Sequence, residues 1–267
     1  MIPDDAVERL MESALNIGAA CDKENVQQWE VYVTQGYGHS LEIEAGRISM
    51  ASGGGDGGFG IRIVEDGRYG YAHLVDPSSA SRAIKQALSI AKRSPSIDGF
   101  ELPGNESAPK VGGMKDKAIL DMGPEDLLEQ GDQVLTRVTE LDSRAVAVGG
   151  GIGVGAGAGA LVTSSGIENG GVHTSHGIGI HVSIDEDEHL TSSYEGESSR
   201  SILKDLTASV DKAVHWSQAT REKIPGGATE DCPVLMTSGG FSPLFSVVVP
   251  SAIKGERLAR GESFWSG

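Results

Sequence analysis

The feature that most limits what this chain can fold into is its glycine content, 38 of 267 residues. Glycine permits positive backbone φ but weakens the interiors of helices and strands, so such a chain needs many tight turns and close backbone approaches. Only 5% of the residues are aromatic, which fits packing by small side chains. The hydrophobic fraction of 38% and the charged fraction of 22% indicate a folded globular protein.

Alternating apolar and polar residues predict an antiparallel sheet in the first part of the chain. The alternating segments are residues 29–33, 41–44, 47–50, 60–64 and 68–72. Turn signals lie at Ala45-Gly46 and at Asp66-Gly67. Apolar residues at helical spacing predict a helix over 4–19, before this sheet, and another over 79–92, after it.

A proline-containing stretch predicts the boundary between two domains. Residues 94–117 combine three prolines with few apolar residues, which is typical of an exposed connection. We therefore predict an N-terminal α+β domain over 1–105, a linker over 106–120 and a β-rich C-terminal domain over 121–267. The fold class is α+β, with helices packed on an antiparallel or mixed N-terminal sheet.

The C-terminal part is predicted to contain both helices and strands. An amphipathic helix starts at Pro124, strands occupy 143–197, and a long helix covers 201–220. Residues 233–236 are predicted to form a short buried strand that leads into a helix from about Ser242.

The charge balance excludes several classes of partner. Lys and Arg total 22 against 38 Asp and Glu, and the net charge of −16 would repel a phosphate backbone, so we expect no nucleic acid as a direct ligand. The chain starts without a basic signal region, and no apolar run approaches the ~20 residues that span a membrane, so we predict a cytoplasmic protein without membrane contact. Cys21 and Cys232 are expected to be reduced, structural thiols.

Residues 149–159 contain a loose match to the dinucleotide-binding pattern G-x-G-x-x-A. That motif requires a helix directly after the glycines, whereas the residues that follow here are typical of a strand. We therefore predict a small-residue strand at this place and no bound cofactor.

Four histidines, His173, His176, His181 and His189, surround an acidic run, a combination of residue types that metal sites use. In a strand, however, His173 and His181 would lie about 26 Å apart, at about 3.3 Å per residue, which is too far for one metal ion. His176 would point to the opposite, apolar face, where we predict a core histidine. A Ser-His-Asp triad stays open as an alternative because the chain has many serines, although no nucleophile-elbow pattern marks a particular one. A hydrolase site that uses the region from His173 to His189 stays open as well.

Four segments carry a resemblance through their order and spacing. They are Trp29 to Asp76, Leu161 to Glu168, Pro233-Val234-Leu235-Met236 and Arg260-Gly261-Glu262-Ser263-Phe264. Together they resemble the TldD/TldE family, also called PmbA or modulator of DNA gyrase, along essentially the whole chain. The resemblance implies that one subunit type, TldD, is a metallopeptidase whose helix carries His-Glu-x-x-x-His, while its partner, TldE or PmbA, lacks those ligands.

The zinc-binding motif of TldD has no counterpart in this chain. Counted from Pro233 without gaps, the first His of the motif falls on Ser246, the Glu on Val247 and the second His on Ser251. Serine hydroxyls are poor zinc ligands and valine cannot act as a base. No His follows His215, so no shift of register restores the motif. The resemblance therefore implies no catalytic, metal or cofactor residue here, and a TldE-like role.

The implied function is that of a non-catalytic subunit of a zinc metallopeptidase complex that degrades or matures unfolded peptides. The expected partner is a TldD-like subunit that holds the zinc, in a heterodimer, or a second copy of the chain in a homodimer. Two alternatives stay open, an active hydrolase with a different site and a protein-binding regulator of the gyrase-modulator type. Pro250 is expected to kink or end its helix. Because family members continue beyond Gly267, we interpret the chain as partial, with an open edge in its C-terminal sheet.

Overall fold

The structure, a computed structural model, describes residues 2–104, 109, 111–186, 189–221 and 233–265. Its contacts divide the chain into two compact units, Met1–Glu222 and Lys223–Gly267. The helices and strands of both units establish an α+β fold, as the sequence predicts.

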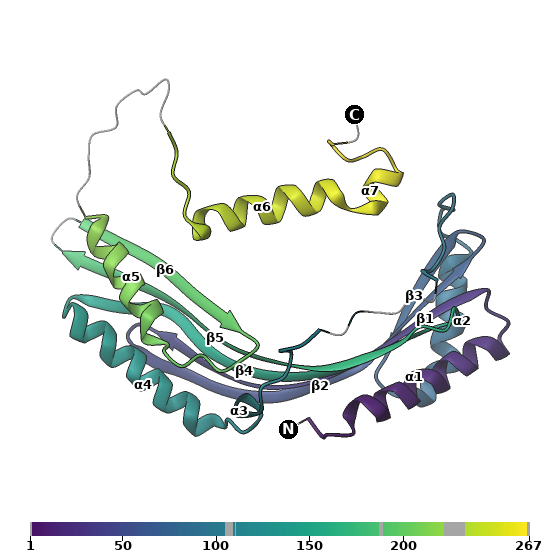
Figure 1. Ribbon diagram of the computed structural model, residues 1–267, viewed down its shortest axis with the longest axis horizontal. Coiled ribbons are helices and arrows are strands. Elements are labelled where there is room, and N and C mark those ends of the chain that lie inside the picture. The colour runs from purple at the N-terminus through teal and green to yellow at the C-terminus, as the bar shows by residue number, and fades with distance from the viewer. Residues whose placement is uncertain (1, 105–108, 110, 187–188, 222–232, 266–267) are drawn as a thin grey trace. The chain divides into compact units, whose positions relative to one another are not determined.

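The first unit is built on one six-stranded antiparallel sheet (Figure 1). The strands follow the order β3-β2-β1-β4-β5-β6, and each pairs with its neighbours in antiparallel register. Their bounds are Gln28–Glu44 for β1, Arg47–Glu65 for β2, Arg68–Leu74 for β3, Ala145–Thr163 for β4, Glu168–Glu186 for β5 and His189–Ser199 for β6.

The strands are longer than the sequence predicts, because glycine continues them where a break is expected. The stretch 53–58 lies inside β2, and residues 34–40 join two predicted strands into β1. A side chain at Gly57 would place its Cβ 2.8 Å from the Thr34 carbonyl oxygen, and one at Gly38 would lie 2.7 Å from the Val154 carbonyl oxygen. The glycines therefore permit close strand approach here instead of ending the strands.

The predicted boundary at 106–120 does not divide the sheet. β1 pairs with β4 along its length, for example Val31 with Val162 and Leu41 with Ile152. Main-chain hydrogen bonds between these strands join the residues on either side of the expected linker into one unit, which extends to Glu222. The boundary between the two compact units therefore follows Glu222 and does not lie at 106–120.

Helices cover one face of this sheet in two groups, α1 with α2 and α4 with α5, as Figure 1 shows for α1 and α4. Their bounds are Ala6–Lys23 for α1, Ala80–Ala91 for α2, Pro124–Leu141 for α4 and Thr207–Ala219 for α5, with a short α3 at Lys117–Leu120 and a 3-10 turn at Pro77–Ser79. Alternate residues of β1 point to this face. Val31 packs in the hydrophobic cluster with α1 and α2, and Leu41 packs in the cluster with α4 and α5. The helix predictions for 4–19, 79–92 and Pro124 are confirmed.

The helix predicted over 201–220 begins only at Thr207. The backbone before Thr207 is held by tertiary hydrogen bonds to other elements. The Ile202 N–H donates to Asp116 Oδ2 at 2.9 Å, and the Leu203 N–H donates to His176 Nδ1 at 3.0 Å. The strands predicted over 143–197 are confirmed as β4, β5 and β6.

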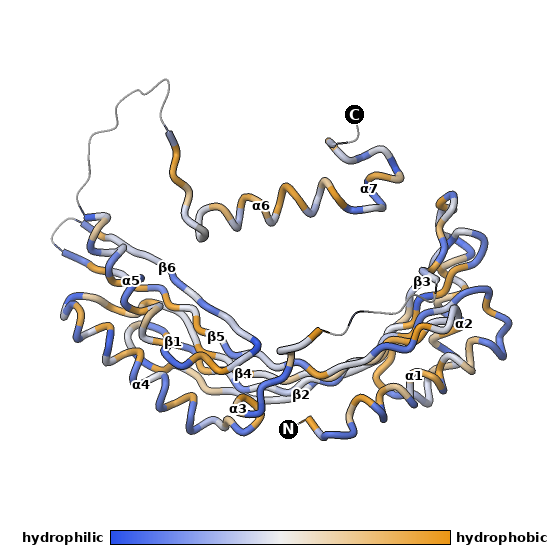
Figure 2. The backbone as a smooth tube through the Cα atoms, viewed as in Figure 1, coloured by the Kyte–Doolittle hydropathy of each residue, from blue (hydrophilic) through white to orange (hydrophobic). Residues whose placement is uncertain are grey.

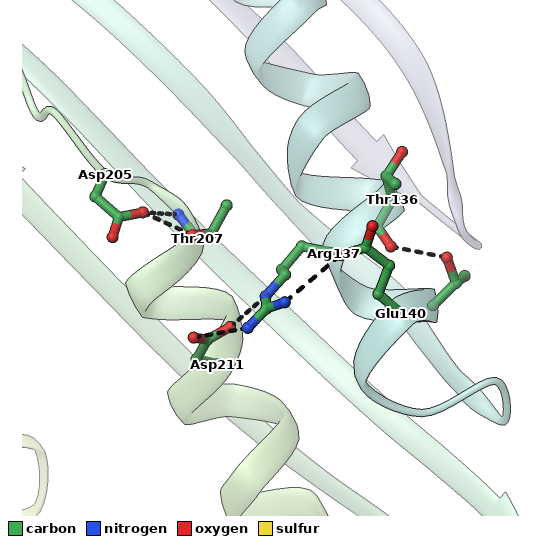
Figure 3. Close-up of polar contacts among 7 residues, drawn as sticks. Thr136, Arg137, Glu140, Asp205, Thr207 and Asp211 are labelled. Atoms are coloured by element: carbon green, nitrogen blue, oxygen red, sulfur yellow. Dashed lines mark hydrogen bonds and ion pairs between the residues drawn. The ribbon is translucent and has the colours of Figure 1, made fainter.

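An arginine joins α4 to α5 on the protein surface (Figure 3). Arg137 Nε and Nη2 donate to Asp211 Oδ1 and Oδ2 at 2.8 and 3.2 Å, a bidentate arrangement. The Asp211 and Glu140 carboxylates raise the pKa of Arg137. We expect Arg137→Ala to lower the thermal unfolding midpoint by no more than a few degrees, because the pair is half exposed and screened by water. Thermal melts of Arg137→Ala and Arg137→Lys would test this, and a loss as large as that of a core substitution would contradict it.

The described residues of the second unit, 233–265, form two helices, α6 at Ser238–Ile253 and α7 at Gly255–Ala259. The short buried strand predicted at 233–236 is wrong, because these residues have no regular structure and the Leu235 side chain is 95% exposed. The helix begins before the predicted start, with Thr237 Oγ1 accepting a hydrogen bond from the Gly240 N–H at 3.3 Å. It continues past Pro250 to Ile253. Figure 2 shows that α6 is largely hydrophobic. Among the described residues, no helix has the length and apolar character that a membrane span requires.

Candidate functional site

The face of the sheet opposite the helices carries a large cavity in the first unit. It has a volume of about 1340 Å³ and lies over the central residues of β1, β4 and β5. Pro109, Val111 and Met114, from the segment that connects α2 to α3, line it as well. This segment is attached to the sheet where the Thr174 N–H donates to the Met114 carbonyl oxygen at 2.9 Å. The cavity therefore has a strand floor and a loop along its border.

Glycine forms the floor of this cavity. On the uncovered face, Gly36 of β1 lies directly opposite Gly157 of β4, and Gly38 lies opposite Gly155 in the next row. Neighbouring Cα atoms in such antiparallel pairs are about 4.5–5.5 Å apart. Gly36, Gly38 and Gly155 are half-buried and add no side chains to the floor, while Gly157 is buried. The floor can thus be approached closely by a ligand.

An aspartate and a histidine border the floor on opposite sides. Asp56 of β2 pairs with Gly36, and His173 of β5 pairs with Gly157, so the four residues form one row across four strands. The Asp56 carboxylate leans over Gly36, since Oδ1 lies 2.7 Å from where a Cβ on that glycine would be. The His173 ring covers Gly157 in the same way, with Cε1 at 2.6 Å. The Asp56 carboxylate and the His173 imidazole ring are therefore held in one row that crosses the strands.

Two further side chains complete the rim. The Tyr32 ring and hydroxyl lie over Gly159, with Oη 3.6 Å from the Cβ position of that glycine, and the side chain is 51% exposed. Ser175 lies two residues from His173 on the same face, with Oγ 3.3 Å from the Cβ position of Gly155. Among the described residues, no hydrogen bond links Ser175, His173 and Asp56 into a catalytic triad, so the rim supplies binding groups and not an assembled nucleophile.

The cavity carries negative charge. Its described lining contains the carboxylates Asp56 and Glu168 and the ring of His173, with no Lys or Arg. The nearby Arg62 is engaged elsewhere, with Nη2 2.7 Å from Glu30 Oε2. The arrangement can therefore accept hydrogen bonds and attract cations, and it disfavours anionic ligands.

The other sequence-predicted histidines do not join this site. His176 is fully buried, and its two ring nitrogens contact the Leu203 N–H at 3.0 Å and Gln130 Oε1 at 3.2 Å, which confirms the predicted core position. His181 shares the face of His173 but pairs with Tyr194 far along β5. No group of three or more His, Cys, Asp or Glu among the described residues could hold a metal ion. Part of the acidic run, 187–188, lies outside the described residues.

The glycine-rich stretch 149–159 and Cys21 have simple structural roles. Residues 149–159 lie within β4 and pair on both sides, which confirms a small-residue strand. Cys21 is a free, buried cysteine, and burial raises the pKa of its thiol to about 12, so it stays protonated. Cys232 lies outside the described residues.

The sequence comparison agrees with the resemblance seen in the N-terminal strands. Residues 29–91 match the family model described as PmbA/TldA metallopeptidase domain 1. Over 96% of this chain, the structure also superposes on TldE from Thermococcus kodakarensis with a TM-score of 0.79, at 21% identity. Residues 29–91 thus resemble the first domain of this family, and the chain as a whole shares the fold of the Thermococcus protein.

Two other solved structures share the fold of this chain. Both are described as modulators of DNA gyrase. The protein from Thermotoga maritima has a TM-score of 0.70 at 12% identity over 81% of this chain. The protein from Bacteroides thetaiotaomicron has a TM-score of 0.66 at 19% identity over 80% of this chain. The chain spans 58% of the Thermococcus protein and 50% of each of the other two. No curated protein matches the sequence.

The three positions that the resemblance assigns to the zinc motif lie on α6. The Ser246 hydroxyl donates to the Pro243 carbonyl oxygen at 2.9 Å, and Val247 is exposed with no donor atom. Ser251, one helical turn further along, is half-buried. Neutral hydroxyls and an alkyl group do not fit the ligand set of a zinc site, which uses imidazole, thiolate or carboxylate groups.

Sequence reasoning missed Tyr32, Thr34 and Asp56 as site residues. Asp56 lies in the glycine run between the predicted strands 47–50 and 60–64, so the pattern gives no strand phase for it. The usable signal was the alternation of β1, because Val31 and Val33 on the apolar face place Tyr32 and Thr34 on the opposite one.

Proposed function

We propose that this chain is the metal-free subunit of a PmbA/TldD-type peptidase and pairs with a zinc-containing subunit that cuts unfolded peptides. The observation that carries the proposal is the composition of α6. Where the catalytic subunit of the family is expected to hold His, Glu and His, this helix has Ser246, Val247 and Ser251. Without an imidazole or carboxylate at these positions, α6 can neither hold zinc nor remove a proton from a bound water.

Two surfaces support a role in an assembly. Large apolar side chains on α6 are exposed, namely Phe241, Leu244, Phe245, Val247, Val248 and Ile253. An apolar surface of this kind is normally covered by further polypeptide. In the first unit, the glycine-floored cavity offers a place where a substrate peptide can lie against the sheet while a partner performs the chemistry.

The test combines the purified chain with a TldD-like subunit that carries His-Glu-x-x-x-His. Each protein alone, and the mixture, is incubated with zinc and an unstructured fluorogenic peptide. We expect no cleavage by the chain alone, and cleavage by the mixture that a zinc chelator abolishes and that exceeds cleavage by the TldD-like subunit alone. Chelator-sensitive cleavage by the chain alone would overturn the proposal, as would a partner whose activity the chain leaves unchanged. A partner variant with Gln for the motif Glu is the matched control.

A second candidate function follows from the descriptions of two neighbours as gyrase modulators. The net charge of −16 is compatible with contact to a basic protein surface. Co-migration of the chain with purified gyrase in gel filtration at physiological salt would favour this function over the peptidase role, and separate elution would exclude it.

A further inference from the structure

We propose that the cavity on the uncovered face is a binding site for an extended, basic peptide segment, with a lysine or arginine side chain held between Asp56 and Tyr32. This inference rests on the proposed function and names the class of peptide that it would accept. Its physical basis is the placement of the Asp56 carboxylate, the Tyr32 ring and glycine backbone on one face of the sheet.

The first step is the position of the carboxylate. Asp56 is exposed, and among the described residues it has no hydrogen-bond or ion-pair partner. A carboxylate in this state is available to a cation from a ligand, unlike Glu30, which already pairs with Arg62 at 2.7 Å. Because Gly36 has no side chain, the Asp56 carboxylate points over the floor and not away from it.

The second step is the surrounding charge and ring surface. Glu168 adds a second negative group to the cavity lining, and no described lining residue is Lys or Arg. Tyr32 offers an exposed ring over Gly159, next to the row of Asp56. A cation above a tyrosine ring and beside a carboxylate gains from both groups, and the planar guanidinium of arginine does so best.

The third step explains why the occupant is an extended peptide. The half-buried Gly36, Gly38 and Gly155 add no side chains to the floor, so an extended backbone can lie on it between the Asp56 carboxylate and the His173 ring, which covers Gly157. His173, on the far side of this patch, can exchange a hydrogen bond with a peptide amide. A nucleic acid is disfavoured, since its phosphates would meet Asp56 and Glu168.

The structure offers two substitutions that change the site without disturbing the fold. A Cβ at Gly36 would meet only the Asp56 carboxylate, at 2.7 Å, before reaching the Ala156 carbonyl oxygen at 4.0 Å. Gly36→Ala therefore displaces the carboxylate and leaves the backbone in place. Asp56→Asn keeps the shape and removes the charge. The matched controls are Gly60→Ala, whose Cβ would have a nearest neighbour at 4.0 Å, and Asp98→Asn, which removes a charge from an exposed loop.

The experiment measures fluorescence anisotropy of labelled, unstructured peptides with the full chain. Three peptides share a Gly-Ser sequence and carry Lys and Arg, Gln, or Glu at the same positions. We expect the basic peptide to bind at least about tenfold more tightly than the Gln peptide, and the Glu peptide to bind weakest. Asp56→Asn and Gly36→Ala should each remove most of that preference, the controls should keep it, and added salt should weaken it.

Equal binding of the three peptides, or an unchanged preference in Asp56→Asn, would overturn the inference. Circular dichroism melts of each variant identify any that fail to fold, and the two substitutions reach the same carboxylate by different routes. The result is independent of the peptidase test, because it uses the chain alone at equilibrium. Charge-independent binding with intact partner-dependent cleavage would refute the basic-peptide site and leave the proposed function standing.

Discussion

Replacing Gly70 with alanine is expected to destabilise the first unit by about 3 kcal/mol or more, the largest effect that we predict for a single methyl group. Gly70 lies on β3, directly beneath α2. A Cβ there would lie 2.0 Å from the Ala87 carbonyl oxygen and 2.7 Å from the Ala91 backbone nitrogen. Both are backbone atoms, so no side chain can rotate away. The helix must therefore move off the sheet and expose residues such as Ile84, which is fully buried.

Urea denaturation followed by circular dichroism measures this effect. The matched control is Gly149→Ala on β4, where an added Cβ would find no atom within 4 Å. We expect the control to unfold near the wild-type midpoint and Gly70→Ala to unfold at much lower urea, or not to fold at all. Equal midpoints for the two variants would show that α2 does not pack against β3 as described.

Replacing His176 with alanine is expected to cost about 2–4 kcal/mol, because the substitution removes a buried ring and two hydrogen-bonding partners. The Leu203 N–H would lose its acceptor, and Gln130 would lose its contact with Nε2. Since the Leu203 N–H donates to Nδ1, that nitrogen is unprotonated, and Nε2 carries the ring proton and donates to Gln130. The folded protein therefore needs the neutral form of this histidine.

This requirement predicts a pH dependence of stability. Burial lowers the pKa of His176 in the folded state, whereas the unfolded chain has the ordinary histidine value of about 6.5. Below about pH 6.5 the unfolded state binds a proton that the folded state does not, so the contribution of His176 to stability falls as the pH falls, until the folded pKa is reached.

The measurement compares the free energy of unfolding at pH 7.5 and at pH 5.5. We expect the wild type to lose more stability between these values than His176→Ala, and His181→Ala to behave as the wild type does, since His181 is only half-buried. A wild type and a His176→Ala variant with the same pH dependence would contradict the buried neutral histidine.

Much of the local structure could be predicted from residue patterns. Helical spacing located α1, α2 and α4, and alternation located parts of β1, β2 and β3. The apolar residues of β5 are enough to place His176 in the core. These features depend on the spacing of apolar residues along the sequence, which can be read without knowledge of the fold. Two errors, the break expected at 53–58 and the buried strand expected at 233–236, arose where glycine or isolated apolar residues leave the pattern ambiguous.

The sequence by itself determined the fold class, the helix faces and the lack of zinc ligands at Ser246, Val247 and Ser251. Tertiary structure alone decided that β1 lies beside β4, and hence that Asp56 and His173 border one glycine floor. Their positions are 117 residues apart in the chain, from 56 to 173, and meet only through strand pairing and register. No local pattern encodes which strands become neighbours, because that choice depends on the summed packing of both helix pairs against the sheet.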